Sequence, residues 1–367
     1  MLRLLVSAGG TGGGVYPALA VVAALGARAD VLWVGSEGGM EASLVKRAGI
    51  AFESIPAAGI HGVGLRRLPA NLARLAQGFR ASGRIIRRYQ PDVLLLTGGY
   101  VGVPVSLAAR RTPKVVYIPD IEPGLALRLL SNLASVVTVT AKETREHLPA
   151  RKRMVVTGYP TRPDLRASDR GEARRRLGLR ADQPVLLASG GSRGARSINE
   201  AIWARLPEFL EMAQLVHIVG ELDWPRITEA TASLTPVQRS RYQAHAYLHE
   251  EMGAALAAAD LAVARAGAST LGELPLFGLP AVLVPYPHAW RYQKVNAAYL
   301  ETHGAAVVVA DALLKEDLLN TVEGLIRDRE RLAAMSSAAR GLARPDAART
   351  IADEVEMSAR LRGTADG

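Results

Sequence analysis

Short apolar runs alternate along the chain with longer stretches in which apolar and polar residues are mixed. The runs are rich in valine, leucine and isoleucine, as in Val93–Thr97 and Val136–Thr140. Continuous apolar runs are typical of strands that helices cover on both faces of a parallel sheet. The pattern therefore predicts an α/β fold built from βαβ units. The predicted strands are Leu2–Ser7, Val31–Val34, Val93–Thr97, Lys114–Ile118, Val136–Thr140, Met154–Thr157, Val185–Ser189, Leu215–Val219, Leu261–Ala264, Ala281–Pro285 and Ala306–Val309.

The chain divides into two halves that each begin with a strand, a glycine-rich loop and a helix. Two prolines and a glycine in Gly158–Pro163 break regular structure between the halves, which marks a linker. Two Rossmann-like domains are predicted, and because ligands bind beyond the carboxyl ends of parallel strands, we expect them to face one another across an interdomain cleft. The last helix begins after Pro345-Asp346 and is expected to pack back on the N-terminal domain. The predicted boundaries are 1–157 for the N-terminal domain, 158–166 for the linker, 167–341 for the C-terminal domain and 342–367 for the C-terminal segment.

Composition narrows the class of protein. With 367 residues, 49% of them hydrophobic and 22% charged, the chain is long enough for two globular domains. It has no cysteine, which excludes disulfides, thiolate metal sites and a cysteine nucleophile and agrees with a reducing cytoplasm. No run approaches the ~18 apolar residues of a membrane span, and the start lacks the basic region of a signal peptide. We therefore expect the protein on the cytoplasmic side of the membrane.

The formal net charge of +10 indicates an anionic partner, namely nucleic acid, a membrane surface or a phosphorylated substrate. A GC-rich genome explains the overall arginine excess equally well, but one stretch stands apart. From Ser54 to Pro91 there is no Asp or Glu, and arginines alternate with apolar residues at partly helical spacing. This stretch is either a core-facing helix with a solvated basic face or a patch that docks on anionic lipids, where each basic residue contributes about 1 kcal/mol. The absence of acidic residues favours the membrane patch, which comprises Leu65, Arg66, Arg67, Leu68, Leu72, Arg74, Leu75, Phe79 and Arg80.

Two glycine-rich loops are candidate anion-binding sites. Gly9–Gly14 follows the first strand and precedes a helix, and Gly190–Ala195 repeats the arrangement in the second half. Amides exposed by glycines, together with a helix N-terminus, suit an anionic oxygen. A purely structural turn is the alternative for either loop. Glu37, near the end of the second strand, also allows a dinucleotide site and hence a nicotinamide oxidoreductase, although the spacing differs from Gly-x-Gly-x-x-Gly.

The stretch from Ala264 to Asn296 has the residue types needed to hold a sugar nucleotide. Its small-residue turn lets a helix N-terminus approach a diphosphate closely. Glu273 follows Ser269 by about one helical turn, so its carboxylate is placed to accept hydrogen bonds from ribose hydroxyls. Gln293 offers both a donor and an acceptor to sugar hydroxyls.

With these motifs the chain resembles the MurG family of bacterial peptidoglycan glycosyltransferases, which belongs to glycosyltransferase family 28 and has the GT-B fold. The resemblance covers essentially the whole chain and rests on Gly-Gly-Thr-Gly-Gly, Thr97-Gly-Gly-Tyr-Val101, Gly190-Gly-Ser-x-Gly-Ala and the block from Ala268 to Asn296. It implies transfer of GlcNAc from UDP-GlcNAc to undecaprenyl-pyrophosphoryl-MurNAc-pentapeptide (lipid I), which forms lipid II. It further implies a peripheral protein on the cytoplasmic face of the inner membrane, with an anionic membrane surface and no nucleic acid among its partners.

The resemblance also implies roles for individual residues. The uracil is expected on main-chain groups of Tyr247–Met252, where Leu248 and His249 remain alternatives. Glu273 is expected on the ribose and Gln293 on the GlcNAc hydroxyls. The implied donor site comprises Thr11, Gly12, Gly13, Arg162, Ser192, Leu248, His249, Ala268, Ser269, Thr270, Leu271, Gly272, Glu273 and Gln293. The implied acceptor side comprises Gly10, Gly14, Tyr100 and Asp120.

Two departures from the family pattern bear on the chemistry. Gly14 stands where the family has a histidine, and Tyr117–Asp120 replaces a His-Glu-Gln-Asn tetrapeptide. The implied reaction is an inverting single displacement, in which a base takes the proton of the acceptor hydroxyl. By sequence context, Asp120 and Glu122 are the carboxylates nearest to the changed motif, so they are the candidate bases. A capping or turn role is the alternative for Asp120. The expectation is that no metal or other cofactor is required, because amides and a helix dipole can stabilise the leaving UDP.

Two alternatives to lipid I transfer remain from the sequence. The departures allow a UDP-sugar transferase with another lipid-linked acceptor. They also allow a homologue that binds UDP-sugar without catalysis.

Overall fold

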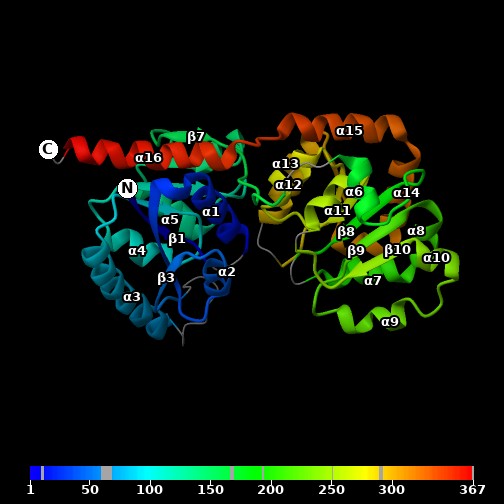
Figure 1. Cartoon of the computed structure of the whole chain (residues 1–367), viewed down its shortest axis with the longest axis horizontal. Coiled ribbons are helices and arrows are strands. Elements are labelled where there is room, and N and C mark those ends of the chain that lie inside the picture. The colour runs from blue at the N-terminus through cyan, green and yellow to red at the C-terminus, as the bar shows by residue number, and fades with distance from the viewer. Residues whose placement is uncertain are drawn as a thin grey trace. The chain divides into compact units, whose positions relative to one another are not determined.

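The computed structural model describes residues 1–9, 12–58, 68–165, 169–191, 194–249, 251–288 and 292–365. The chain folds into two compact units (Figure 1). The N-terminal unit consists of Met1–Pro163 and Pro345–Gly367, and the C-terminal unit of Asp164–Arg344. The division therefore falls inside the segment predicted as the linker.

The N-terminal unit contains a seven-stranded sheet in the order β3-β2-β1-β4-β5-β6-β7, in which all neighbours are parallel. Its strands are β1 Leu2–Ser7, β2 Ala29–Ser36, β3 Ala51–Ile55, β4 Val93–Leu96, β5 Lys114–Ile118, β6 Val136–Val139 and β7 Met154–Val156. Its helices are α1 Gly12–Leu25, α2 Glu41–Arg47, α3 Leu68–Tyr89, α4 Gly102–Ala108, α5 Leu125–Leu133 and α16 Ala347–Ala365, with short 3₁₀ segments η1 Gly26–Arg28 and η3 Lys142–His147.

The C-terminal unit contains a six-stranded parallel sheet in the order β10-β9-β8-β11-β12-β13. Its strands are β8 Val185–Ser189, β9 Gln214–Ile218, β10 Tyr242–His245, β11 Leu261–Ala264, β12 Ala281–Leu283 and β13 Ala306–Val308. Its helices are α6 Arg170–Arg176, α7 Arg196–Ala204, α8 Leu206–Met212, α9 Ile227–Ala230, α10 Pro236–Ser240, α11 Met252–Ala258, α12 Thr270–Phe277, α13 Tyr292–Thr302, α14 Leu314–Arg327 and α15 Arg329–Leu342, with η4 Trp224–Arg226 and η5 Asp311–Leu313.

The strand order reverses once in each sheet, and both glycine-rich loops lie at these reversals. In the N-terminal unit the sheet runs outward from β1 in one direction and from β4 in the other, and the first loop follows β1. In the C-terminal unit the same division lies between β8 and β11, and the second loop follows β8. Crevices outside the carboxyl ends of strands at such a switch point are where doubly wound folds bind ligands. The GT-B-like pair of parallel-sheet α/β domains predicted from the sequence is confirmed.

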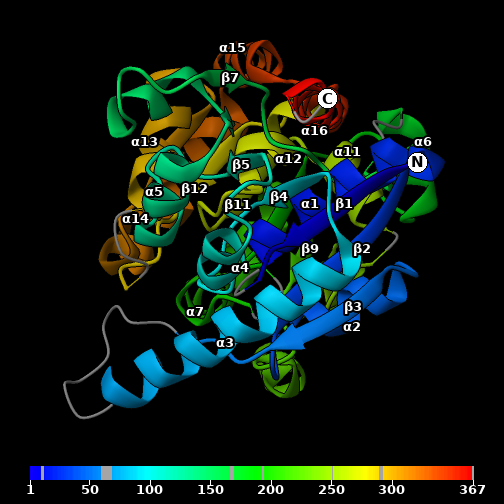
Figure 2. The ribbon, with the colours of Figure 1, turned by 90° about the vertical axis from the view of Figure 1, so that its left-hand side faces the viewer.

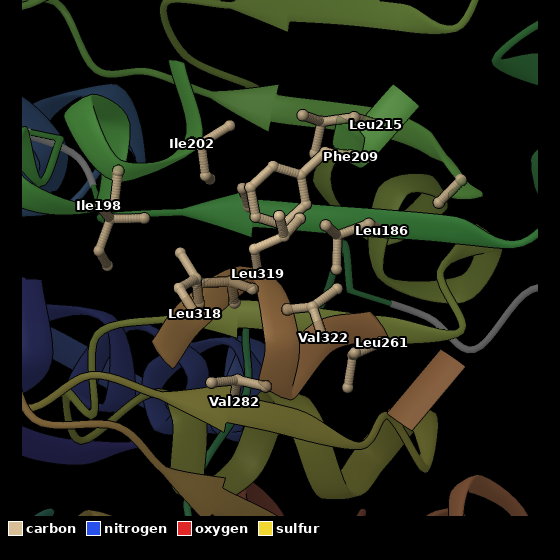
Figure 3. Close-up of a cluster of buried hydrophobic side chains, with 14 of the residues drawn as sticks. Leu186, Ile198, Ile202, Phe209, Leu215, Leu261, Val282, Leu318, Leu319 and Val322 are labelled. Carbon is tan, nitrogen blue, oxygen red and sulfur yellow. The ribbon is translucent and has the colours of Figure 1, made fainter. Parts of the chain in front are cut away.

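Each sheet is buried by apolar side chains of its own unit. In the C-terminal unit, Ile202 of α7, Phe209 of α8 and Val322 of α14 pack with Leu186 and Leu261 of the central strands (Figure 3). All of these side chains are almost fully excluded from solvent. This burial explains why the central strands are continuous apolar runs in the sequence.

The C-terminal helix α16 belongs to the N-terminal unit. It packs against α1, β4 and β5. The guanidinium of Arg153 donates two hydrogen bonds, of 2.6 and 2.8 Å, to the carboxylate of Glu354. A further ion pair of 2.6 Å joins Arg28 to Glu356. The end of the chain is thus fixed to the unit with which the chain begins.

The sequence pattern did not reveal two strands. These are β3 and β10, the outermost strands on the corresponding side of each sheet. Most of their residues are exposed or only partly buried, and polar side chains interrupt their apolar pattern. Each has one strand neighbour, so it needs no continuous apolar run to be stable.

Candidate functional site

The first glycine loop lies against the segment that follows β4. Gly99 has φ +80°, and a Cβ atom on it would lie 2.8 Å from the carbonyl oxygen of Gly9. Only glycine allows the two main chains to approach so closely. Tyr100, predicted on the acceptor side, follows directly and is exposed. Gly10 and Thr11 lie outside the described residues, and Gly12 and Gly13 begin α1.

Gly14 is buried in the first turn of α1, and its surroundings explain why a larger residue is unfavourable. A Cβ atom at this position would lie 3.1 Å from the main-chain carbonyl oxygen of Thr97. Such a contact is tighter than ordinary packing allows, and the opposing atom belongs to the backbone. A histidine at this position would therefore press on the end of β4 in this chain.

Tyr117 is fully buried and fixes the segment that leads to Asp120. Its hydroxyl lies 2.8 Å from Oγ1 of Thr140, and Thr140 donates a 2.7 Å hydrogen bond to the carbonyl of Pro119. Because Thr140 has one proton to give, Tyr117 is the donor of the first bond. Burial raises the pKa of the Tyr117 hydroxyl well above its usual range, and the nearby charge of Asp120 adds to this effect. Tyr117 therefore stays protonated and is not suited to act as a base.

The two candidate bases occupy different environments. Glu122 is buried, and its Oε1 accepts a 2.8 Å hydrogen bond from Nη2 of Arg128 in α5. Arg128 also donates to the carbonyl of Pro123, so the pair fixes the start of α5. Asp120 is only partly buried and follows β5 at the carboxyl edge of the sheet. These surroundings favour Asp120 over Glu122 as the group that meets a substrate.

Arg162, predicted to contact the donor, lies over an aromatic ring that the sequence analysis did not single out. Its guanidinium carbon is 5.3 Å from the centroid of Tyr16 in the first turn of α1. An arginine stacked in this way keeps its charge and gains a fixed position. The signal in the sequence was only an aromatic residue shortly after the glycine loop.

The second glycine loop needs its glycines for steric reasons. A Cβ atom on Gly190 would lie 2.2 Å from the amide nitrogen of Ala195, and one on Gly194 would lie 2.3 Å from the carbonyl oxygen of Val219. The main chain therefore packs tightly at Gly190 and Gly194, on either side of the residues outside the described ranges. Ser192, predicted in the donor site, lies outside the described residues.

The turn before α12 presents open main-chain donors. Among the described residues, the amides of Ala268 and Ser269 donate to no acceptor, whereas the next amides bond within the turn. A Cβ atom on Gly267 would meet no atom within 4 Å, so neither packing nor a positive φ demands glycine there. Buried Asn296 of α13 holds the turn by donating a 3.2 Å hydrogen bond to the carbonyl of Ala266. In the part of the chain that the structure describes, the arrangement leaves two main-chain donors unpaired at a helix N-terminus, which suits an anionic group.

Some of the remaining predicted residues of α12 are buried in the unit, and others are partly exposed. Thr270 donates a 2.6 Å hydrogen bond to the carbonyl of Gly267, and the Leu271 side chain is buried. Gly272 and Glu273 are partly exposed in the first turn, and the Glu273 amide bonds the carbonyl of Ser269 at 2.8 Å. The helix thus places the carboxylate of Glu273 about one turn beyond the open amides.

Gln293 is held by one end of its side-chain amide. Its Oε1 accepts a 2.8 Å hydrogen bond from the main-chain nitrogen of Tyr286. The side-chain oxygen already accepts this bond, so the NH₂ group is the end better placed to donate to a ligand. Tyr286 is exposed, and its ring lies 5.4 Å from that of His288 in an edge-to-face arrangement.

A partly buried ion pair that the sequence analysis missed connects these loops. Arg265, at the end of β11, pairs with Asp311 at 2.5 Å and donates a 2.7 Å hydrogen bond to Ser197 in the first turn of α7. Its guanidinium also lies 5.2 Å from the centre of the Tyr286 ring. The pair therefore ties the second glycine loop to the loop that holds Gln293. Its partners are far apart in the sequence, so no local motif reveals them.

The loop after β10 contains the two candidates for binding a base through the main chain. The Leu248 side chain is buried and that of His249 is exposed, with the His249 ring 4.6 Å from Tyr247. Among the described residues the main-chain groups of both positions are without hydrogen-bond partners. Burial of Leu248 anchors the loop, while the choice between the two residues stays a prediction.

The described part of the predicted basic patch lies on α3. Gly78, Ser82 and Ile85 face the unit, and Gly78 is necessary because a Cβ atom there would lie 2.2 Å from the carbonyl oxygen of Pro56. Leu72, Arg74, Phe79 and Arg80 are exposed, and Leu75 is partly buried. Leu65, Arg66 and Arg67 lie outside the described residues, and α3 begins at Leu68.

A second group of exposed apolar side chains lies on α5. Helix α4 packs against both α3 and α5 (Figure 2). Three leucines of α5 at helical spacing, Leu125, Leu129 and Leu133, are exposed by 52, 47 and 39%. In the sequence, the sign of this exposed α5 face was a helix with leucines on more than one side. Those are too many leucines to bury against one sheet.

No group of three or more side chains suited to bind a metal ion occurs within the described ranges. In the same part of the chain, every helix is too short or too polar to cross a bilayer.

Comparison with known proteins identifies the relatives of both units. Residues 4–139 match the glycosyltransferase family 28 N-terminal domain, and residues 185–351 match the family 28 C-terminal domain. A protein of Roseiflexus sp. (strain RS-1) is 42% identical over 99% of this chain and 97% of its own length. It is named UDP-N-acetylglucosamine--N-acetylmuramyl-(pentapeptide) pyrophosphoryl-undecaprenol N-acetylglucosamine transferase.

Further relatives agree. A protein of the same name from Desulforudis audaxviator (strain MP104C) is 41% identical over 98% of this chain and 99% of that protein. The crystal structure of Acinetobacter baumannii MurG matches with a TM-score of 0.79 and 29% identity, covering 97% of this chain and 100% of that one.

Proposed function

Because this chain belongs to glycosyltransferase family 28, we propose that it transfers GlcNAc from UDP-GlcNAc to the muramyl sugar of lipid I, forming lipid II for peptidoglycan synthesis. The observation that carries this proposal is likeness along nearly the whole chain to transferases whose names state that reaction. The described geometry supports it with a tight glycine loop and an open helix N-terminus at the switch point of the C-terminal unit.

The donor is bound by the C-terminal unit in this proposal. The open amides of Ala268 and Ser269 and the α12 dipole receive the diphosphate, and Glu273 accepts hydrogen bonds from the ribose. The NH₂ group of Gln293 donates to a GlcNAc hydroxyl oxygen, because its carbonyl is held by Tyr286. Main-chain groups at Leu248 or His249 read the uracil. Amides and the helix dipole stabilise the charge on leaving UDP, so the proposal requires no metal or other cofactor.

The acceptor reacts at the N-terminal unit in this proposal. The first glycine loop and Tyr100 receive the lipid diphosphate. Asp120 takes the proton of the muramyl hydroxyl, whose oxygen forms a bond to C1 of GlcNAc as the bond from C1 to UDP breaks, which inverts the anomeric centre. Tyr117 and Thr140 hold Asp120 in place through the carbonyl of Pro119.

The protein works at the cytoplasmic face of the plasma membrane in this proposal. The exposed Leu72, Phe79 and basic side chains of α3 meet the lipid surface, and the leucine face of α5 extends this contact. Apolar insertion and attraction to anionic headgroups act together in such peripheral binding. This surface brings the enzyme to an acceptor that is anchored in the bilayer.

The test is transfer of radiolabelled GlcNAc from UDP-GlcNAc to a short-chain lipid I analogue, with and without EDTA. The expected result is a lipid II analogue at the same rate in both. No product despite tight UDP-GlcNAc binding would overturn the proposal and support another acceptor or a binding protein. Product that disappears with EDTA would overturn the metal-independent donor site alone.

A further inference from the structure

Glu41, the first residue of α2, is a fully buried carboxylate that the proposed reaction does not use. Its Oε1 accepts two hydrogen bonds, of 2.8 Å from the amide of Ser36 and 2.7 Å from the Ser36 hydroxyl. Its Oε2 is also buried and accepts no hydrogen bond from any described residue. A buried carboxylate oxygen without a donor costs free energy, so this half of the group is unexplained by stability alone.

Two glycines make room for this carboxylate. A Cβ atom on Gly39 would lie 2.3 Å from Oε1 of Glu41, and one on Gly9 would lie 2.7 Å from the same oxygen and 3.3 Å from Oε2. Gly9 is the last described residue before the gap in the loop that joins β1 to α1. The main chain of Gly99 also packs against Gly9. The carboxylate therefore lies directly against the main chain where the first glycine loop begins.

The main-chain amide of Gly9 is the complementary hydrogen-bond donor. Gly9 is buried, and among the described residues its amide donates to no acceptor. An unpaired buried donor and an unpaired buried acceptor are thus neighbours at the switch point of the N-terminal unit. Buried polar groups are normally paired, so a small movement that joins them is favourable.

We propose that Glu41 is a positioning residue for the acceptor, and that its Oε2 accepts a hydrogen bond from the amide of Gly9 when the lipid-linked diphosphate is bound. This inference rests on the proposed function. Glu41 does not touch the substrate, because its side chain is completely buried. It acts by fixing the main chain from which the first glycine loop starts.

The test compares steady-state kinetics of Glu41→Gln with those of Glu37→Gln, a matched change at an exposed neighbour. For Glu41→Gln we expect the KM for a short-chain lipid I analogue to rise about tenfold, the effect of losing one charge-assisted hydrogen bond. The KM for UDP-GlcNAc should stay within about twofold, a split that general unfolding would not produce. Glu37→Gln should match the wild type in both constants.

A measurement on the wild-type protein keeps the inference testable if Glu41→Gln does not fold. Hydrogen exchange at the Gly9 amide should slow about tenfold when the lipid I analogue is added, and should not change with UDP-GlcNAc alone. Unchanged exchange with the analogue, or an equal rise of both KM values in Glu41→Gln, would overturn the inference while leaving the proposed function intact. Absence of GlcNAc transfer by the wild type would overturn both.

Discussion

The hydroxyl of Thr97 donates a 2.5 Å hydrogen bond to the carbonyl of Gly14, although the two residues are 83 positions apart in the sequence. The bond joins the end of β4 to the first turn of α1, the two elements that flank the switch point of the N-terminal unit. It holds in place Gly14, where the family resemblance implies a histidine.

Replacing Thr97 with valine removes this hydroxyl without changing the side-chain shape. We expect a loss of about 1 kcal/mol in the free energy of unfolding, because the buried Gly14 carbonyl loses a donor. The KM for the lipid I analogue should rise, while the Kd for UDP-GlcNAc should not. Chemical denaturation and steady-state kinetics measure both effects. Thr97→Ser, which keeps the donor, should retain the acceptor KM, and an equal loss in both variants would contradict this account.

Asp120→Asn tests the proposed base. The amide keeps the size of the side chain but cannot take a proton, so kcat should fall about 10²- to 10⁴-fold. The Kd for UDP-GlcNAc should be unchanged. Glu122→Gln is the matched comparison. It weakens the ion pair with Arg128, so it should lower the free energy of unfolding and leave kcat nearly unchanged. Full turnover by Asp120→Asn would exclude this carboxylate as the base.

Gln293→Glu tests the orientation of the Gln293 side chain. A carboxylate still accepts from the Tyr286 amide but no longer offers NH₂ donors to the sugar. We expect the KM for UDP-GlcNAc to rise about tenfold, whereas inhibition by UDP, which lacks the sugar, should change little. Equal losses for UDP and UDP-GlcNAc would show that the residue acts on the nucleotide.

His217 connects buried polar groups in the C-terminal unit. Its Nδ1 lies 2.9 Å from the Tyr242 hydroxyl and its Nε2 lies 2.9 Å from Oδ1 of Asn199. The NH₂ group of Asn199 donates to Asp223 and to the carbonyl of Val219, so Oδ1 is an acceptor and the neutral ring carries its proton on Nε2. Burial lowers the pKa of His217 from 6.5 to about 3.

This depressed pKa predicts that stability falls with acidification. Between pH 6.5 and about 3 the unfolded chain binds a proton at His217 that the folded protein does not. The contribution is therefore complete above pH 6.5 and is lost as the pH falls, at up to about 1.4 kcal/mol per pH unit. Denaturation curves measured from pH 7 to pH 4 should show this slope in the wild type. In His217→Gln the slope should be smaller by the contribution of one bound proton, up to about 1.4 kcal/mol per pH unit. Equal slopes for the wild type and the variant would refute the assignment.

Phe79→Ser tests the membrane surface. Losing an inserted phenylalanine should weaken binding to vesicles with anionic lipid at least tenfold, because burying that ring contributes about 1.5–3 kcal/mol. Co-sedimentation measures the change, and added salt should weaken binding of the wild type. Leu313→Ser, at an exposed leucine of the C-terminal unit, is the matched control and should bind as the wild type does. Equal loss in the two variants would exclude a specific contact at α3.

The sequence by itself determined the central architecture of each unit. A strand such as Val93–Leu96 is buried on both faces, so its continuous apolar composition is visible without any partner. The two glycine loops could be placed because a turn between strand and helix has a local signature. Likewise, the basic stretch that became α3 was evident from its lack of acidic residues.

Tertiary structure decided the features that depend on residues distant in the chain. The edge strands β3 and β10 gain stability from a neighbouring strand rather than from their own apolar pattern. The position of Glu41 under Gly9 and the contact between Arg162 and Tyr16 arise only when the strand order brings separate loops together. Periodicity reports which side of an element is buried, whereas strand order determines which loops meet, and no local pattern contains that order.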